Sequence, residues 1–239
     1  MDKIITWRNI DSFAYVNKKQ ITCDIKGIVV SFFGLGSTAT HFNDDTMEGV
    51  MWGKKGILWV SPYNNPWNWM NRQAIDMTDE ILDVIFAHYS LPESTPVISI
   101  GGSMGGESAL VYTRYAKRTP KACVADCPVC DMPFHYNERV DLPRTLYSAF
   151  YNEEGSVDEV LRRYSPLHLA DEMPDIPYYI FHCNADKAVN IDAHSKKFVE
   201  AMKPRHNVTF VEVDGYAHCQ LPPDVRAKYN DCILKEIES

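Results

Sequence analysis

A short apolar segment that runs into glycines, a serine and a helical pattern constrains the fold of this chain most strongly. Residues 96–100 are mostly apolar and rich in β-branched side chains, which favours a buried strand, and the pattern over residues 104–118 favours a helix. Between them stands Gly101-x-Ser103-x-Gly105. Glycines without Cβ atoms let a strand and a helix approach closely across a sharp turn. The sequence therefore predicts a strand, a tight turn and a helix, with Ser103 at the turn.

The turn gives Ser103 a chemical setting as well as a structural one. A serine held in a strained turn at a helix N-terminus is presented as a nucleophile, and the helix N–H groups favour negative charge developing beside it. A glycine-rich turn with a solvated serine is the simpler alternative. The order strand, glycine, serine, glycine and helix is the one that a nucleophile elbow requires, so we favour the nucleophile.

Length and composition place the chain among ordinary globular proteins. With 239 residues, 45% hydrophobic and 23% charged, we expect one domain spanning residues 1–239. The net charge of −8 argues against nucleic acid or an anionic membrane as a partner. The N-terminus lacks the apolar core of a signal peptide, and seven cysteines is an odd count without a disulfide framework. We therefore expect a cytoplasmic protein that needs no cofactor or metal.

Strand and helix patterns alternate along most of the chain. The segments expected to form strands are residues 4–16 (a strand or hairpin), 21–33, 57–60, 96–100, 122–125, 178–181 and 208–213, and those expected to form helices are 70–89, 104–118, 192–202 and 223–237. Such alternation predicts an α/β fold with a mostly parallel, doubly wound sheet covered by helices on both faces. Residues 127–176 interrupt it with many prolines and aromatic residues, and we expect this insertion to cap the active site as a lid.

A serine nucleophile needs a base, and the base needs an orienting acid. Functional loops of a doubly wound sheet lie at the carboxyl ends of strands, and two late loops there contain Asp186 and His218. Asp126, which follows the preceding strand, is the alternative acid. We expect the other histidines to be structural or superficial, with His182 nearest the site.

These motifs together carry a resemblance to a known family. The whole chain resembles an α/β-hydrolase, and its C-terminal half resembles the catalytic domain of the prolyl-oligopeptidase-like and esterase branch. The stretches that carry the resemblance are Gly101-Gly102-Ser103-Met104-Gly105-Gly106, Ser165-Pro166-Leu167-His168, residues 182–189 and Gly215-Tyr216-Ala217-His218. The chain order serine, aspartate and histidine is the order of that family. Cys183 and Asn190 depart from its usual glycine and proline, and neither is a reacting group.

The resemblance implies a role for each of these residues. Ser103 would attack an acyl carbon, His218 would take and return the proton, and Asp186 would orient the imidazole. The oxyanion hole would combine the N–H groups of Met104 and Leu35. Phe33 stands where the family usually has histidine.

Two other motifs compete with this interpretation. Gly34-x-Gly36-x-x-Ala39 imitates a dinucleotide fingerprint, but no apolar periodic helix follows it. Cys127-x-x-Cys130 has no second pair for zinc, so two thiols in a lid segment are expected, with a redox pair as the alternative.

The substrate is the least constrained part of the prediction. Tyr63, Trp67 and Trp69 lie on loops near the expected cleft and are candidates for contact with a sugar or an aromatic acyl group, although tryptophan is equally common in cores. We expect a serine hydrolase that acts on a small carboxylic ester, such as an acylated carbohydrate. Only about 100 residues precede the elbow, which favours an esterase over a peptidase or amidase of the same branch. A catalytically inactive binding module is the alternative of another class.

Overall fold

The computed structural model describes residues 4–36, 42 and 44–239, and in these residues seven strands form one sheet. The order across the sheet is β1-β3-β2-β4-β5-β6-β7, and only β1 is antiparallel to its neighbour. The strands are β1 (Ala14–Val16), β2 (Gly27–Phe32), β3 (Ile57–Pro62), β4 (Val97–Gly102), β5 (Ala122–Asp126), β6 (Tyr178–Cys183) and β7 (Val208–Val213). The predicted α/β fold with a mostly parallel sheet is confirmed.

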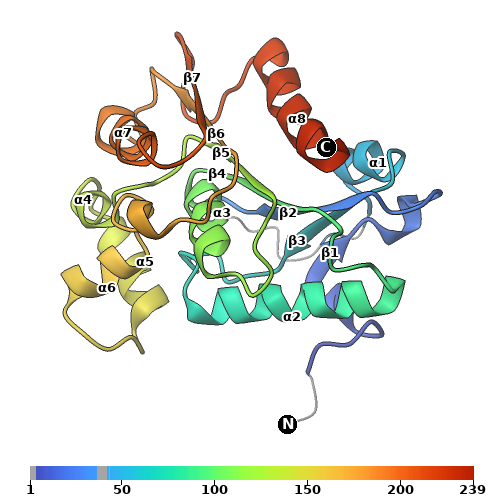
Figure 1. The fold of residues 1–239 in the computed structure, drawn as a ribbon. Helices are drawn as coiled ribbons and strands as arrows, with labels where there is room; N and C mark the ends of the chain where they lie inside the picture. The colour runs from blue at the N-terminus through green and yellow to red at the C-terminus, as the bar shows by residue number, and fades with distance from the viewer. Residues whose placement is uncertain (1–3, 37–41, 43) are drawn as a thin grey trace.

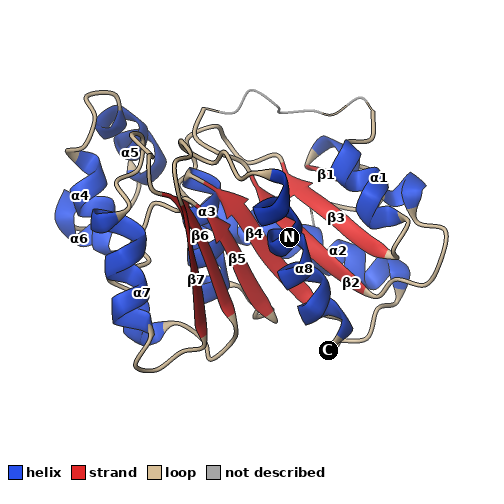
Figure 2. Ribbon diagram, turned by 90° about the horizontal axis from the view of Figure 1, so that it is seen from above, coloured by secondary structure: helices blue, strands red, loops and turns tan. Residues whose placement is uncertain are grey.

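Helices cover both faces of the sheet (Figures 1 and 2). They are α1 (Met47–Gly53), α2 (Arg72–Tyr89), α3 (Met104–Tyr115), α4 (Met132–Tyr136), α5 (Leu142–Phe150), α6 (Val157–Arg163), α7 (Lys197–Met202) and α8 (Pro223–Glu238), with short 3₁₀ turns η1 (Ile10–Ser12), η2 (Lys18–Gln20) and η3 (Ala170–Glu172) and a π turn η4 (Asp192–Lys196). Side chains of α2, α3 and α7 belong to one buried cluster, and those of α1 and α8 to the other. The sheet therefore has a hydrophobic core on each side.

The inner strands are almost entirely buried, because both faces of the sheet are covered. Every residue of β3, β5 and β6 is buried, as expected for parallel strands between two helix layers. The carboxyl ends of β2, β4, β5, β6 and β7 share one edge, since these strands are parallel. Loops that leave this edge carry most of the predicted site.

Several expected elements differ from the observed ones. Residues 127–176, predicted as a loop insertion, contain the three short helices α4, α5 and α6. The expected strand over 21–33 is shortened to β2, and α1 was not predicted. Helices of 5, 7 and 9 residues offer too few turns for an amphipathic period to stand out. That residues 127–176 act as a lid stays a prediction.

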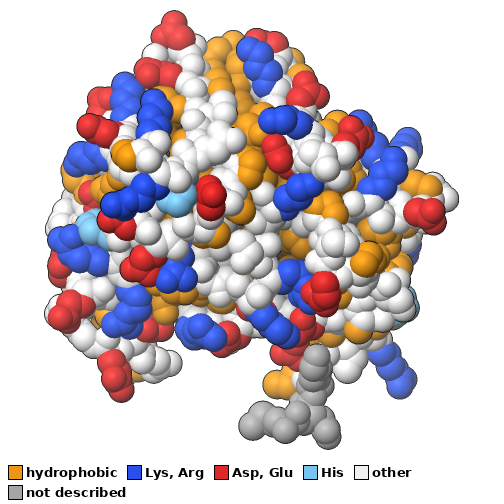
Figure 3. All heavy atoms as spheres, viewed as in Figure 1, with side chains coloured by type: hydrophobic (Ala, Val, Ile, Leu, Met, Phe, Trp, Pro, Cys, Tyr) orange, Lys and Arg blue, Asp and Glu red, His pale blue; other side chains and the backbone are white. Residues whose placement is uncertain are grey.

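The surface mixes charges of both signs. On the face in Figure 3, acidic and basic side chains are interspersed over most elements. Among the described helices, none has the length and apolarity needed to cross a bilayer. All seven cysteines are free thiols.

Candidate active site

Ser103 lies at the sharp turn between β4 and α3. Its backbone has φ 61° and ψ −126°, a left-handed conformation that non-glycine residues seldom adopt. The Ser103 N–H donates to the Asp126 carbonyl at 2.9 Å, and the Ser103 carbonyl accepts from Gly106 N–H at 3.0 Å. A Cβ at Gly101 would overlap the Gly105 carbonyl, and one at Gly105 would overlap the Phe32 carbonyl. The two glycines thus permit the close strand–helix contact that holds the serine in this strained turn.

His218 and Asp186 meet across the loops that follow β7 and β6. His218 Nδ1 lies 2.5 Å from Asp186 Oδ2. The other carboxylate oxygen, Oδ1, accepts from the N–H groups of Ala188 at 2.7 Å and Val189 at 3.0 Å. The Asp186 side chain is fully buried, whereas the His218 side chain is 26% exposed. This leaves one imidazole nitrogen, Nε2, available on the side away from the carboxylate.

The charges of this pair support each other. Burial alone would raise the pKa of Asp186, but hydrogen bonds from His182 and His218 and from the Val189 N–H hold it far below its usual range. Burial alone would lower the pKa of His218, but its hydrogen bond to Asp186, together with its contact with Cys127, raises it to about 9. Asp186 is therefore a carboxylate that favours an imidazolium at His218, the electrostatic role of the acid in a catalytic triad.

His182 holds the acid loop in place. This completely buried histidine lies with Nε2 3.1 Å from the Val189 carbonyl and 3.3 Å from Asp186 Oδ2, while its Nδ1 contacts Ser195 Oγ at 2.7 Å. A nitrogen that faces two acceptors carries the proton, which assigns Nε2–H as a donor. His182 thus orients Asp186 from behind.

Asp126, the alternative acid, has a different partner. Its carboxylate Oδ2 lies 3.5 Å from Arg226 Nη2, and its main-chain oxygen accepts the Ser103 N–H. The carboxylate that is hydrogen-bonded to His218 is that of Asp186. The geometry therefore favours Asp186 over Asp126.

The nucleophile and the imidazole are not joined in this structure. Both residues lie within the described part of the chain, where no hydrogen bond links Ser103 Oγ to His218. His218 Nε2 instead faces the sulfur of the next residue, with Cys219 Sγ at 3.7 Å. Hydrogen bonds between catalytic groups are often long or absent without substrate. The complete relay from serine to aspartate stays a prediction.

The two proposed oxyanion donors lie on the loops next to Ser103. Gly34, the neighbour of Leu35, approaches the serine so closely that a Cβ there would lie 3.8 Å from Ser103 Cβ. Among the described residues, the N–H groups of Leu35 and Met104 donate to no acceptor. Met104 is the first residue of α3, where a helix leaves its N–H groups unpaired. Both groups remain candidates for binding an oxyanion.

The candidate aromatic substrate contacts differ in their exposure. Trp69 is completely buried and its indole N–H donates to Thr145 Oγ1 at 3.0 Å, so its ring is part of the core and is not available to a substrate. Trp67 is 37% exposed, with the Arg144 guanidinium 5.4 Å from its ring. Tyr63 is partly buried and its hydroxyl accepts the Phe42 N–H at 3.0 Å. Trp67 is the most accessible of the three.

Comparisons with known proteins identify the architecture. No family model matches the chain, and no curated protein sequence matches it significantly. Among solved structures, the acylaminoacyl peptidase of Pyrococcus horikoshii superposes with a TM-score of 0.70 at 15% identity over 90% of this chain. The chain has an α/β-hydrolase fold. The resemblance predicted from the motifs is therefore confirmed for the fold.

Other proteins with this α/β-hydrolase fold match over most of both chains. Thermogutta terrifontis esterase 2 has a TM-score of 0.64 at 15% identity, with 94% of this chain and 88% of that one covered. Esterase PE8 has a TM-score of 0.59 at 15% identity, with 91% and 95% covered. By contrast, the match covers only 37% of the acylaminoacyl peptidase chain, so this chain spans little more than a third of its length.

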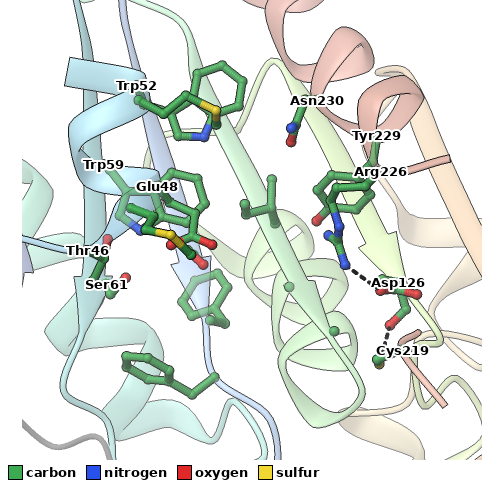
Figure 4. A pocket seen from close by; sticks show the side chains of 18 of the residues that line it. Thr46, Glu48, Trp52, Trp59, Ser61, Asp126, Cys219, Arg226, Tyr229 and Asn230 are labelled. Carbon is green, nitrogen blue, oxygen red and sulfur yellow. Dashed lines mark hydrogen bonds and ion pairs between the residues drawn. The ribbon is translucent and has the colours of Figure 1, made fainter. Parts of the chain in front are cut away.

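A cavity lies beside the nucleophile of this α/β-hydrolase fold. It has a volume of about 590 Å³ and is bounded by α1, α8 and the ends of β2, β4 and β5 (Figure 4). Its lining includes Gly102, directly before Ser103, and Cys219, directly after His218. The aromatic side chains of Trp52, Trp59 and Tyr229 also line it. The cavity adjoins the candidate catalytic groups.

Sequence reasoning missed two clusters, because each joins residues distant in the chain. In one, the Glu138 carboxylate contacts His135 and His194. In the other, Cys127 Sγ accepts from the N–H of Cys219 at 3.4 Å. Cys130, by contrast, belongs to the core cluster on the other side of the sheet from Cys127, so the C-x-x-C motif does not act as a pair. Ala39 of the dinucleotide-like motif lies outside the described residues.

Proposed function

We propose that this chain is a serine hydrolase that cleaves carboxylic esters through an acyl-enzyme intermediate. The observation that carries the proposal is the position of Ser103, strained at φ 61° on the N-terminus of α3. Next to it, at the same edge of the sheet, lies the hydrogen-bonded pair of His218 and Asp186. A nucleophile, a base and an orienting carboxylate with unpaired N–H groups nearby are the parts that acyl transfer requires.

The reaction would proceed in two half-reactions. Ser103 Oγ attacks the acyl carbon while its proton passes to His218 Nε2, and the Met104 and Leu35 N–H groups stabilise the oxyanion. The tetrahedral intermediate collapses, the alkoxide takes the proton from His218 and leaves as an alcohol, and the acyl group stays on Ser103. Water then attacks the acyl-enzyme with His218 as base and releases the carboxylic acid. In this proposal, substrate binding turns His218 Nε2 from Cys219 toward Ser103.

The preferred substrate is a small acyl ester of a carbohydrate or similar alcohol. Two matched structures of comparable length are named as esterases, which supports an ester substrate. The exposed ring of Trp67 offers an apolar face of the kind that sugar rings stack on. Cleavage of peptides or amides is the second candidate, favoured by the match to an acylaminoacyl peptidase.

The proposed setting follows from charge and thiol chemistry. A net charge of −8 favours a small-molecule substrate over nucleic acid or an anionic membrane. Seven free cysteines, four of them fully buried (Cys123, Cys127, Cys130 and Cys183), favour a reducing compartment such as the cytoplasm.

A fluorophosphonate probe tests the nucleophile directly. Intact-mass spectrometry should find one adduct per chain, and peptide mapping should assign it to Ser103. The Ser103→Ala variant should remain unlabelled, while Ser94→Ala, which removes an exposed serine from a turn, should label like the wild type. Absence of an adduct on folded wild-type protein would favour the binding-module alternative. A panel of acetyl, feruloyl and peptidyl substrates then separates esterase from peptidase.

A further inference from the structure

Thiols from three separate strand ends gather beside the candidate catalytic imidazole. Cys127 follows β5, Cys183 ends β6, and Cys219 follows His218. Cys127 Sγ accepts N–H bonds from both Cys183 and Cys219, each at 3.4 Å. Main-chain N–H groups that point at a sulfur fix its position. The fold thus holds one thiol in place where two others and an imidazole converge.

The spacing of three of these groups matches that of ligands around a small cation. Cys127, Cys219 and His218 each offer one ligand atom, and these three atoms lie within 4.8 Å of one another. Cys219 Sγ is 3.7 Å from His218 Nε2. Bond lengths to tetrahedral zinc place sulfur and nitrogen ligands about 3.6 Å apart, and two sulfurs about 3.8 Å apart. The observed arrangement therefore needs less than about 1 Å of adjustment to hold such an ion.

Asp186 prepares His218 for this role. It binds Nδ1 at 2.5 Å, so the neutral imidazole carries its proton there and turns the lone pair of Nε2 toward Cys219. A carboxylate behind a histidine is the usual support of a histidine that ligates zinc. The feature that makes Nε2 a good base thus also makes it a good metal ligand.

Asp126 supplies an independent observation that points to a cation ligand here. Its side chain is 4% exposed, and its Oδ1 is buried with no hydrogen-bond partner. A carboxylate oxygen of Asp126 lies within 4.8 Å of the sulfurs of Cys127 and Cys183. Leaving a buried charged oxygen unsatisfied is costly. A cation bound to the neighbouring thiols would relieve that cost.

The cluster is reachable from solvent. Cys219 is partly exposed, and both Cys219 and Asp126 line the cavity of about 590 Å³ between α1 and α8. Figure 4 places Asp126 and Cys219 together at one wall of this cavity, with Arg226 beside them. A hydrated ion therefore has a path to the thiols.

We propose that Cys127, Cys219 and His218 bind one thiophilic divalent cation of the zinc type, and that the bound ion blocks the catalytic imidazole. Binding releases the two thiol protons to solvent and requires no oxidant. The fourth position is open to the Asp126 carboxylate or to water, as in a three-ligand zinc site. The blocking step rests on the proposed function, because it assumes that His218 Nε2 is the base. The binding step does not.

The binding step is tested by zinc titration of the fully reduced, full-length protein against a chromogenic chelator. We expect one ion per chain, with affinity reduced at least about tenfold in Cys219→Ser and in Cys127→Ala. Cys232→Ser, which removes a half-buried thiol from α8, is the matched control and should bind like the wild type. Cobalt in place of zinc should give a thiolate charge-transfer band that is weaker in both test variants, because each variant keeps only one of the two thiolates. If the reduced wild type binds no ion, or if neither substitution weakens binding, the proposal is wrong. If the Cys127→Ala variant misfolds because this residue is buried, the zinc affinity of Cys219→Ser alone decides the test.

The blocking step is tested by fluorophosphonate labelling of the same samples. One equivalent of zinc should slow labelling at least about tenfold in the wild type, a chelator should restore the rate, and Cys219→Ser should lose the zinc effect relative to its own metal-free rate. A wild type that binds zinc yet labels equally fast refutes the block. A wild type that binds zinc but is not labelled even with chelator leaves the metal site standing and refutes the proposed hydrolase function.

Discussion

Two clusters in this structure join histidines to a carboxylate at similar distances. They differ in the partners of the second imidazole nitrogen. Asp186 contacts His218 at 2.5 Å, and Glu138 contacts His135 at 2.6 Å and His194 at 3.1 Å. The second nitrogen of His194, Nδ1, is occupied by N–H groups of Cys130 and Asp131. The second nitrogen of His218 meets only a thiol, at 3.7 Å. A short contact to a carboxylate therefore does not distinguish a base from a structural histidine, but a free second nitrogen on a partly exposed ring does.

The histidines of the two clusters also differ in how deeply they are buried. His135 is 2% exposed and His194 is completely buried, while the His218 side chain is 26% exposed. Burial lowers the pKa of His135, even though Glu138 opposes this, whereas the pKa of His218 rises to about 9. The Glu138 cluster also joins α4 to the loop after β6, since Glu138 Oε1 accepts the Asn190 N–H at 3.1 Å. Its geometry suits it to holding two segments together.

The largest expected difference between the clusters is in catalysis. His218→Asn should reduce kcat/KM on an activated ester by about 10⁴-fold or more, because removing a triad base abolishes the relay. His135→Asn should stay within about tenfold of the wild type, since an asparagine amide can still donate to Glu138. The measurement is steady-state kinetics, with thermal melting to verify folding. Comparable losses in both variants would contradict the assignment of His218 as the base.

The sequence predicted the His218 cluster and missed the Glu138 cluster for a physical reason. Ser103 stands in a local motif whose glycines are required by its own turn, and Asp186 and His218 follow strands that apolar runs predict. His194 and Glu138 are 56 residues apart and meet only through the packing of a segment that the sequence predicts to be a loop. The same limit explains why Cys127 and Cys219, 92 residues apart, were not connected.

The sequence also does not predict which single aromatic side chains are buried. Trp67 and Trp69 are two positions apart on one turn, yet one is 37% exposed and the other completely buried. The left-handed backbone of Trp69, with φ 43°, accompanies its burial, and its bond to Thr145 comes from α5. Neither feature has a local signal. Strand order and the elbow are thus predictable, whereas the walls of the cleft depend on tertiary packing.

The pH dependence of turnover gives the next largest effect. Only neutral His218 accepts the proton, so with its pKa raised to about 9, kcat/KM should rise about tenfold per pH unit below that pKa and level off above it. The profile should be recorded from pH 6 to 10 with a chelator present. In Asp186→Asn the residual activity should level off at lower pH, because the group that raises the His218 pKa is gone. A wild-type profile that levels off at the ordinary histidine value of about 6.5 would contradict the pairing with Asp186.

The smallest expected effect is on stability and concerns the Glu138 cluster. Burial alone would raise the pKa of Glu138, but hydrogen bonds from His135 and His194 hold it far below its usual range, so this carboxylate stays ionised while it accepts several N–H groups. Glu138→Gln replaces one accepting oxygen by a donor that faces histidine N–H groups. We expect it to lower the free energy of unfolding at pH 7 by about 1–3 kcal/mol, measured by urea denaturation.

Urea denaturation at acid pH tests the role of Glu138 further. A carboxyl whose folded-state pKa is depressed contributes stability above its unfolded pKa, about 4.3, and that contribution is lost as the pH falls below it. The stability difference between wild type and Glu138→Gln should therefore shrink below about pH 4.5. Glu154→Gln, on an exposed side chain, is the matched control and should unfold like the wild type at every pH. If Glu138→Gln instead leaves stability unchanged and reduces kcat/KM as severely as His218→Asn, then the buried cluster takes part in catalysis, and a free second nitrogen on a partly exposed ring does not mark the base.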